Sequence, residues 1–265
     1  MPFVTSQGRD IYFETHGDGA PLLLLHGAGS NAATWWQQLP TFTRTFRCIT
    51  MDIRCFGRSP APTAEFKLPN FVDDVIAVLD AVQAPQAVVL GQSLGGMIGL
   101  QVALRHPQRV AALVACDRPL AVDHPALVDS VERRFRTVAA VSIEQRSLGR
   151  WFLEHHPERA ALYAQINHFN PSAYRVPADE WRQAMLRLNE PRNLTPTQAL
   201  ARLACPTLFL VGAEDPIVPV SAMLDLARLV PGSEVSVIDN AAHSAYFEQA
   251  EAFNAVVMDF LQRRL

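Results

Sequence analysis

A serine between glycines carries the strongest chemical signal in the sequence. The segment Gly91-Gln92-Ser93-Leu94-Gly95 directly follows the apolar run 87–90 and directly precedes a helical pattern over 94–105. A G-x-S-x-G segment between a strand and a helix is typical of a nucleophile elbow, where small residues allow the serine to project from a strained turn. The amide of Leu94 then opens the helix, where N–H groups favour developing negative charge. Ser93 is therefore the candidate nucleophile.

A serine hydroxyl is a poor nucleophile at neutral pH, so this chemistry needs a histidine base and a carboxylate that orients it. Asp215 lies on a predicted loop after the apolar run 207–211, and His243 lies on a predicted loop after the run 235–238. The chain order of serine, acid and histidine is the order found in α/β-hydrolases. Asp215 and His243 are therefore the candidate acid and base.

Short apolar runs alternate with helical patterns along most of the chain, and these elements must position the three residues. Residues 9–14 alternate like an exposed edge strand. The other predicted strands are 21–25, 48–51, 87–90, 110–115, 207–211 and 235–238, and the predicted helices outside residues 119–201 are 71–82, 94–105, 222–229 and 246–261. Such alternation predicts a mostly parallel sheet with helices on both faces, and ligands bind such sheets beyond the carboxyl ends of the strands.

The alternation stops after Cys116 and resumes near Cys205. Residues 119–201 contain helical patterns at 125–139 and 143–154 and no buried-strand run. We therefore expect residues 1–118 and 202–265 to form an α/β core, with residues 119–201 inserted as a helical cap.

With these motifs the chain resembles α/β-hydrolase-fold enzymes along nearly its whole length. Besides the elbow, Asp215 and His243, the resemblance rests on His26-Gly27-Ala28-Gly29 and on residues 52–59. One departure is Cys55, which stands where the family usually has glycine. The fold that the resemblance implies is a mostly parallel central sheet with flanking helices and an inserted helical cap.

The resemblance also implies a catalytic triad of Ser93, His243 and Asp215, with an oxyanion hole made of the backbone N–H groups of Ala28 and Leu94. Alternatives for the acid remain. Some relatives place the triad acid at the position of Asp117, whereas Glu214 and Asp239 are interpreted as structural. His26 is expected to fix the turn 27–29 by packing and hydrogen bonding.

The nucleophile type narrows the reaction. Relatives that dehalogenate alkanes or open epoxides carry aspartate at the elbow, so Ser93 argues against both. Serine with an oxyanion hole suits attack on an ester or lactone carbonyl and an acyl-enzyme intermediate. Residues 91–99 and 243–248 are similar to the carboxylesterase and 3-oxoadipate enol-lactonase branch. The chain is therefore interpreted as a carboxylic ester hydrolase.

Three other functions stay open on the same fold. Carbon–carbon hydrolases often have Asn before the nucleophile and Trp soon after the histidine, where this chain has Gln92 and Ala245 or Tyr246. A cofactor-free perhydrolase or haloperoxidase also resembles the pattern. The non-enzymatic alternative is a ligand-binding receptor with a vestigial triad.

The predicted substrate is a small ester or lactone, and four residues are candidates to contact it. They are Gly29, Trp35, Arg118 and Trp151. Aromatic residues suit a mainly apolar pocket, and Arg118 would meet the carboxylate of an acidic lactone. The sequence does not fix the oligomeric state.

Composition excludes several other classes. Lys and Arg number 23 against 26 Asp and Glu, giving a net charge of -3, so there is no basic surplus for binding nucleic acid. The sequence has no run of roughly 18 apolar residues that would span a membrane, and residues 1–10 do not resemble a signal peptide, which predicts a cytoplasmic protein. The four cysteines form no CxxC pair, no metal-binding spacing is present, and the predicted chemistry needs no cofactor.

Overall fold

The computed structural model describes residues 2–117, 121–130, 142–169 and 177–265. Its centre is one eight-stranded sheet with the strand order β1-β2-β4-β3-β5-β6-β7-β8. The strands are β1 (Phe3–Ser6), β2 (Arg9–His16), β3 (Ala20–Leu25), β4 (Phe46–Met51), β5 (Ala87–Gln92), β6 (Val110–Cys116), β7 (Thr207–Gly212) and β8 (Glu234–Ile238). Strand β2 is antiparallel to β1 and β4, and the remaining neighbours are parallel, which confirms the predicted mostly parallel sheet.

The predicted edge strand is the one strand whose place was wrong. Strand β2 lies between β1 and β4, with Tyr12 opposite Phe3 and Phe13 opposite Met51. Ile11 on β2 is fully buried. The edge strand on this side of the sheet is instead β1, which has only four residues, too few to show an alternating pattern, and which is held by its pairing with β2.

Alternate side chains of the parallel strands point into two separate hydrophobic layers. On β3, Leu23 and Leu25 belong to one layer, and Leu22 and Leu24 belong to the other. The first layer is covered by α2 (Leu68–Ala81), α3 (Leu94–Arg105) and α9 (Val220–Arg228), and the second by α1 (Leu39–Phe42) and α11 (Ala250–Arg264). Both sheet faces are therefore covered, as a buried parallel sheet requires.

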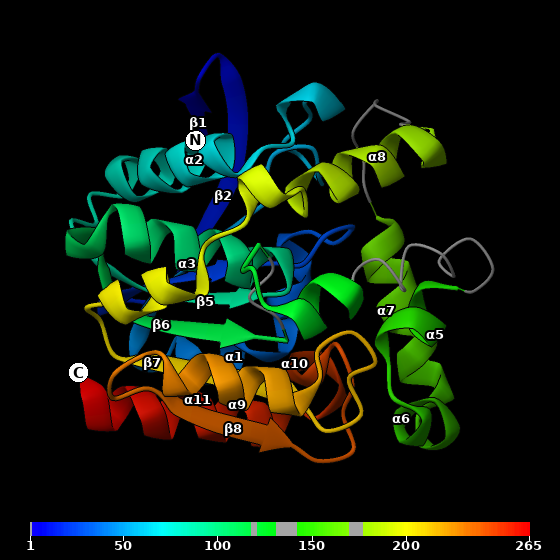
Figure 1. The fold of residues 1–265 in the computed structure, drawn as a ribbon. Coiled ribbons are helices and arrows are strands. Elements are labelled where there is room, and N and C mark those ends of the chain that lie inside the picture. The colour runs from blue at the N-terminus through cyan, green and yellow to red at the C-terminus, as the bar shows by residue number, and fades with distance from the viewer. Residues whose placement is uncertain (1, 118–120, 131–141, 170–176) are drawn as a thin grey trace.

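A helical segment lies between β6 and β7. It contains the helical residues 125–130 and the helices α5 (Ile143–Ser147), α6 (Arg150–His155), α7 (Pro157–His168) and α8 (Ala178–Leu188). Figure 1 shows α5, α6 and α7 beyond the end of the sheet toward which β6 and β8 point. Near the ends of the segment, a bridge joins Val122 to Thr195, and the Asp123 N–H donates to the Thr195 carbonyl over 3.0 Å. The cap boundaries at 119 and 201 stay a prediction.

Two predicted helices are broken in the structure. The pattern over 143–154 is divided into α5 and α6, because Leu148 and Gly149 are extended, with ψ of 144° and 155°. The pattern over 246–261 is divided into α10 (Ala245–Glu248) and α11 at Gln249, which has φ of -125° and ψ of 56°. Of the predicted helix 125–139, residues 131–139 lie outside the described residues.

Short 3-10 helices occupy several connections. They are η1 (Ala32–Gln37), η2 (Thr63–Glu65), η3 (Pro107–Arg109), η5 (Pro191–Asn193) and η6 (Thr197–Arg202). The loop between β4 and η2 contains Cys55, whose φ of 76° lies in the left-handed region. That conformation favours glycine, so the family's usual glycine at this position has a physical reason, and Cys55 adopts the same backbone at a cost in strain.

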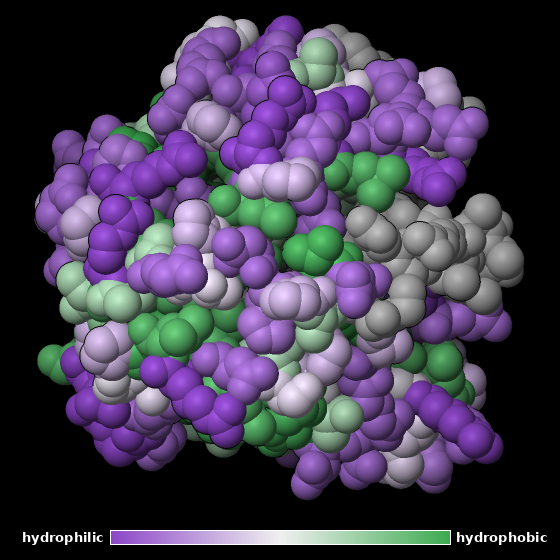
Figure 2. Space-filling view, viewed as in Figure 1, coloured by the Kyte–Doolittle hydropathy of each residue, from purple (hydrophilic) through white to green (hydrophobic). Residues whose placement is uncertain are grey.

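The face drawn in Figure 2 is mixed in hydropathy. Figure 2 shows hydrophobic residues on this face as separate groups among hydrophilic ones. Within the described ranges, no helix has the length and apolar character that crossing a membrane would demand.

Candidate active site

Ser93 occupies a sharp turn between β5 and α3. Its φ of 51° and ψ of -113° are strained for a residue with a side chain, and α3 begins at the next residue. A Cβ at Gly91 would overlap the backbone of Gly95, and a Cβ at Gly95 would overlap the carbonyl of Leu25. Only glycine therefore allows the helix to approach β5 and β3 this closely. The predicted strand, turn and helix around Ser93 are confirmed.

The structure brings Ser93, His243 and Asp215 together. Nε2 of His243 lies 3.0 Å from Oγ of Ser93, and Nδ1 lies 2.9 Å from Oδ2 of Asp215. The other oxygen of Asp215 accepts hydrogen bonds from the backbone N–H groups of Ile217 and Val218, over 2.7 and 3.0 Å. The side chain of Asp215 is fully buried. Its direction is fixed by three donors, which are Nδ1 of His243 and the two backbone N–H groups.

This arrangement determines what the imidazole can do. A neutral ring that donates from Nδ1 to Asp215 has an unprotonated Nε2, which accepts the proton of the Ser93 hydroxyl. The buried carboxylate stabilises the imidazolium that forms when the proton moves. The three side chains can therefore generate a serine alkoxide transiently.

The turn after β3 lies directly against the elbow. A Cβ at Gly27 would overlap the side-chain oxygen of Gln92 and would lie 3.3 Å from Cβ of Ser93. Gly29 has φ of 84°, a backbone conformation that favours glycine. Ala28 therefore lies between Gly27, which touches the elbow, and Gly29, whose backbone is in the left-handed region. On the elbow side, Leu94 is the first residue of α3, and its N–H has no acceptor within the helix.

His26 fixes that turn. Its Nδ1 donates to the carbonyl of Gly27 over 2.7 Å, and its Nε2 accepts the N–H of Ile53 over 2.9 Å. Complete burial lowers the pKa of His26, which keeps the ring neutral as these two bonds require. The hydrogen bonds agree with the predicted role of His26 in holding the turn.

The alternative acids are turned to other partners. Oδ1 of Asp117 accepts the N–H of Gly212 over 3.0 Å, and Oδ2 accepts the N–H of Ala245 over 3.2 Å. Burial, and secondly the charge of Asp215, raises the pKa of Asp117 well above its usual range. Glu214 accepts the N–H of Arg150, and Asp239 is exposed.

Three polar residues, Gln92, Asp117 and Glu248, hold the backbone around His243, and the sequence did not indicate this role for any of them. Nε2 of Gln92 donates to the carbonyl of His243 over 2.6 Å. Asp117 binds the N–H of Ala245, and Glu248 binds the N–H groups of Ala242 and Ser244. In the sequence, each of these three residues is visible only as a polar residue at the end of an apolar segment. That pattern does not indicate which backbone group the side chain binds.

The candidate substrate-contacting residues have different surroundings. Trp35 is fully buried and packs on Tyr246 with ring centroids 4.9 Å apart, so its described contacts are those of core packing. Trp151 on α6 is half-buried and stacks on His155 with centroids 4.5 Å apart. Arg118 lies outside the described residues. Substrate contact by these residues stays a prediction.

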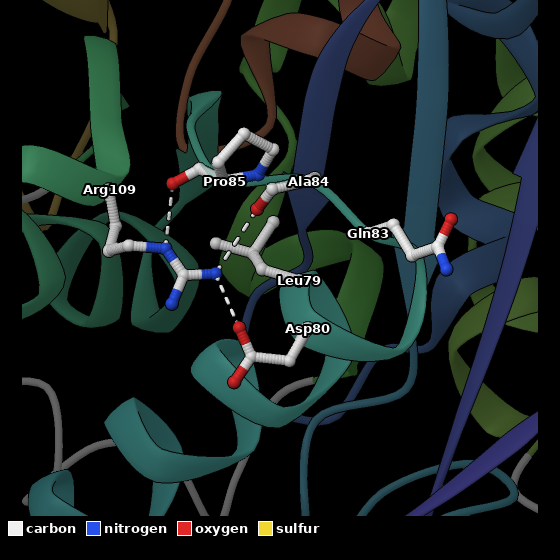
Figure 3. Close-up of a pocket in the computed structure, with 6 residues that line it drawn as sticks. All are labelled: Leu79, Asp80, Gln83, Ala84, Pro85 and Arg109. Carbon is white, nitrogen blue, oxygen red and sulfur yellow. Dashed lines mark hydrogen bonds and ion pairs between the residues drawn. The ribbon is translucent and has the colours of Figure 1, made fainter.

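A surface hollow elsewhere on the molecule is lined by Leu79, Asp80, Gln83, Ala84, Pro85 and Arg109. Figure 3 shows the Arg109 guanidinium bound to Asp80 and to the carbonyls of Ala84 and Pro85. Arg109 precedes β6, so this hollow lies at the amino ends of the strands, opposite the end that carries Ser93.

The described residues also contain no group of three or more His, Cys, Asp or Glu side chains that could hold a metal ion.

A sequence profile of the α/β hydrolase fold matches residues 20–250. The chain belongs to the α/β hydrolase family. This α/β hydrolase is 27% identical to 3-oxoadipate enol-lactonase 2 of Acinetobacter baylyi, over 98% of this chain and 96% of that protein. It is 28% identical to 2-hydroxymuconate semialdehyde hydrolase of a Pseudomonas species, over 92% of this chain and 88% of that protein.

A solved structure confirms that this α/β hydrolase shares the fold of a relative over 98% of the chain. The structure is that of Est816, described as an N-acyl homoserine lactone degrading enzyme. It superposes with a TM-score of 0.83 at 29% identity, covering 98% of this chain and 100% of that one.

Proposed function

We propose that this α/β hydrolase cleaves carboxylic esters or lactones through an acyl-enzyme intermediate. The observation that supports the proposal is the chain of two hydrogen bonds from Ser93 Oγ through His243 to Asp215. The similarity to an enol-lactonase and to a lactone-degrading enzyme favours the same substrate class.

The proposed reaction has two steps. Oγ of Ser93 attacks the carbonyl carbon while Nε2 of His243 accepts its proton, and the backbone N–H groups of Ala28 and Leu94 bind the oxyanion. The carbon–oxygen bond to the alcohol then breaks, and His243 returns the proton to the leaving oxygen. Water, deprotonated by His243, hydrolyses the acyl-Ser93 ester and restores the hydroxyl. These steps use only groups of the chain and water.

The test is hydrolysis of p-nitrophenyl acetate and butyrate by the wild type and by Ser93→Ala. We expect the substitution to lower kcat/KM by roughly 10³-fold or more, because removing a triad member removes the nucleophile. Unchanged turnover in Ser93→Ala would overturn the proposal. Esters of graded acyl length and a panel of lactones, including an acidic lactone, then define the preferred substrate.

The relationship to 2-hydroxymuconate semialdehyde hydrolase favours carbon–carbon hydrolysis as the second candidate. A ring-cleavage product offered beside p-nitrophenyl butyrate distinguishes the two activities. Faster loss of the ring-cleavage product at equal concentrations would favour the second candidate. A receptor with a vestigial triad would instead bind ligand tightly and form no adduct with a fluorophosphonate probe.

A further inference from the structure

A second buried carboxylate, that of Glu248, lies beside the His243 loop and takes no part in the hydrogen bonds between Ser93, His243 and Asp215. Glu248 is the last residue of α10 and is 2% exposed. Its Oε1 accepts the N–H of Ala242 over 2.9 Å and the N–H of Ser244 over 3.2 Å. One carboxylate oxygen therefore binds the backbone immediately before and immediately after His243.

The other oxygen of Glu248 reaches a different part of the chain. Oε2 accepts the N–H of Gly149 over 2.6 Å, and Gly149 lies in the extended break between α5 and α6. A Cβ at residue 149 would stand 3.2 Å from Oε2 of Glu248 and 2.9 Å from Oε2 of Glu214. Glycine at this position therefore allows the segment to approach both carboxylates closely.

These bonds have a direct consequence for His243. The position of a side chain follows the position of its own backbone, and the backbone of His243 is fixed on both sides by Oε1 of Glu248. Hydrogen bonds from backbone N–H groups to a buried carboxylate are charge-assisted and strong. A catalytic ring must be held within about 0.5 Å of its working position, and a displacement of about 1 Å can lower the rate by about 10²-fold.

We propose that Glu248 is a positioning residue that holds His243 at hydrogen-bond distance from Ser93 and couples this position to the segment between α5 and α6. The inference rests on the proposed function of Ser93. Glu248 touches neither the imidazole nor the hydroxyl, so it acts through the backbone of Ala242 and Ser244. Its contact with Gly149 makes the placement of the helical segment a determinant of the catalytic rate.

The first experiment compares Glu248→Ala and Glu248→Gln with the wild type. The alanine loses all three bonds and is expected to lower kcat on p-nitrophenyl butyrate by about 10²-fold. The glutamine keeps one acceptor oxygen for Ala242 and Ser244 and places an amide N–H₂ against the N–H of Gly149, so we expect a loss of about tenfold. KM is expected to stay within about twofold, because neither substitution removes a group that contacts substrate.

The readouts separate positioning from stability. Active sites are counted with a fluorophosphonate probe, and both kcat per labelled site and the rate of labelling are expected to fall together, because both need His243 near Ser93. The matched control is Glu214→Gln, since Glu214 also binds the start of α6 through the N–H of Arg150 but not the His243 loop. We expect this control to keep wild-type kcat. A lower Tm with wild-type kcat per labelled site in the Glu248 variants would overturn the inference.

A second pair of variants tests the coupling to Gly149 with Glu248 in place. The φ of -68° at Gly149 and the ψ of 144° at Leu148 both fit proline at residue 149. Gly149→Pro removes the N–H donor, whereas Gly149→Ala keeps it and adds the same Cβ. We expect kcat of the proline variant to be about tenfold below that of the alanine variant. Equal kcat values in the two variants would contradict the coupling.

The failures of the two proposals are distinguishable. Wild-type hydrolysis that survives Ser93→Ala would remove the proposed function and the inference with it. Hydrolysis that is lost in Ser93→Ala but keeps its kcat in Glu248→Ala would leave the proposed function standing and remove the positioning role alone.

Discussion

Two buried aspartates lie beside His243, and the direction of their oxygens distinguishes them. Asp215 directs Oδ2 at Nδ1 of the imidazole, whereas Asp117 directs both oxygens at the N–H groups of Gly212 and Ala245. Gly212 ends the strand before Asp215, and Ala245 follows His243 by two residues. We therefore interpret Asp117 as a support for the backbone of both loops.

Because of this difference, replacing aspartate by asparagine is expected to change kcat by unequal amounts at residues 215 and 117. Asp215→Asn is expected to lower kcat by about 10²- to 10⁴-fold, because the amide no longer stabilises the imidazolium or selects its tautomer. Asp117→Asn is expected to lower kcat by less than about tenfold while reducing the free energy of unfolding, because an N–H₂ group then faces a backbone donor. Steady-state kinetics with active-site titration, together with urea unfolding, measures both. A larger loss of kcat in Asp117→Asn would reverse the two roles.

Glu248 predicts a pH dependence of stability. Burial raises the pKa of Glu248 from the ordinary value of 4.5 to about 7 in the folded protein. Between these values the folded state holds a proton that the unfolded chain has released, so the contribution of Glu248 is complete below pH 4.5 and is lost as the pH rises through 7. The loss amounts to about 3 kcal/mol.

Urea unfolding of the wild type and of Glu248→Gln at pH 5 and pH 8 measures this contribution. We expect the wild type to lose stability relative to the variant as the pH rises. Glu234 does not disturb the comparison, because Arg263 lowers its pKa to about 2 and its contribution is therefore constant above pH 5. An equal difference between the two proteins at both pH values would contradict the prediction.

At the residue scale, the sequence indicated the candidate catalytic side chains better than it indicated the residues that hold them in place. Ser93, Asp215 and His243 each follow an apolar run, so strand ends predicted that they would share one edge of the sheet. Gln92 and Glu248 bind backbone groups of residues 242–244, and the pairing of a side chain with a distant N–H or carbonyl leaves no spacing pattern in the chain.

At the scale of elements, two of the three glycines of helix α3, Gly95 and Gly99, are expected to differ in their sensitivity to substitution. A Cβ at Gly95 would overlap the carbonyl of Leu25, which belongs to a central strand and cannot move away. A Cβ at Gly99 would meet only the side-chain ends of Leu113 and Val89, each at 3.0 Å. The two positions lie on the same helix, one turn apart.

Gly95→Ala is therefore expected to lower the free energy of unfolding by about 3 kcal/mol or more, the size typical of severe overpacking. Gly99→Ala is expected to change it by less than about 1 kcal/mol, since the gain in helix propensity offsets the contact with the two side chains. Urea unfolding of both variants tests this ranking. Similar losses at both positions would show that the close approach of α3 to β3 is not the limiting contact.

Periodicity predicted elements where local pattern and tertiary environment agree, and it failed where long-range contacts interrupt a pattern. The bounds of α3 match the predicted helix, whereas the patterns over 143–154 and 246–261 each became two helices. Gly149 and Glu248 lie at those two breaks and bind each other. Strand β1 was missed because its four residues are too few to show an alternation of apolar and polar side chains.

At the scale of the whole molecule, the helical segment between β6 and β7 is hydrogen-bonded to the loops that follow β3, β7 and β8. Asn31, just after the Gly27–Gly29 turn, donates to the carbonyls of Ile166 and Phe169 over 2.9 and 3.0 Å. Ser130 donates to the carbonyl of Ile217, two residues after Asp215. Glu248 binds Gly149 beside His243. The segment therefore contacts the loops after β3, β7 and β8, which carry Ala28, Asp215 and His243.

The most direct measurement of the central claim is the site of covalent labelling by a fluorophosphonate probe, read by intact mass and peptide mapping. The proposed mechanism predicts one adduct per chain, located on Ser93, together with loss of p-nitrophenyl butyrate hydrolysis. The variants Ser93→Ala and His243→Ala should show neither labelling nor hydrolysis. A fully active wild type that carries no adduct on Ser93, or a His243→Ala variant that labels at the wild-type rate, would contradict the claim.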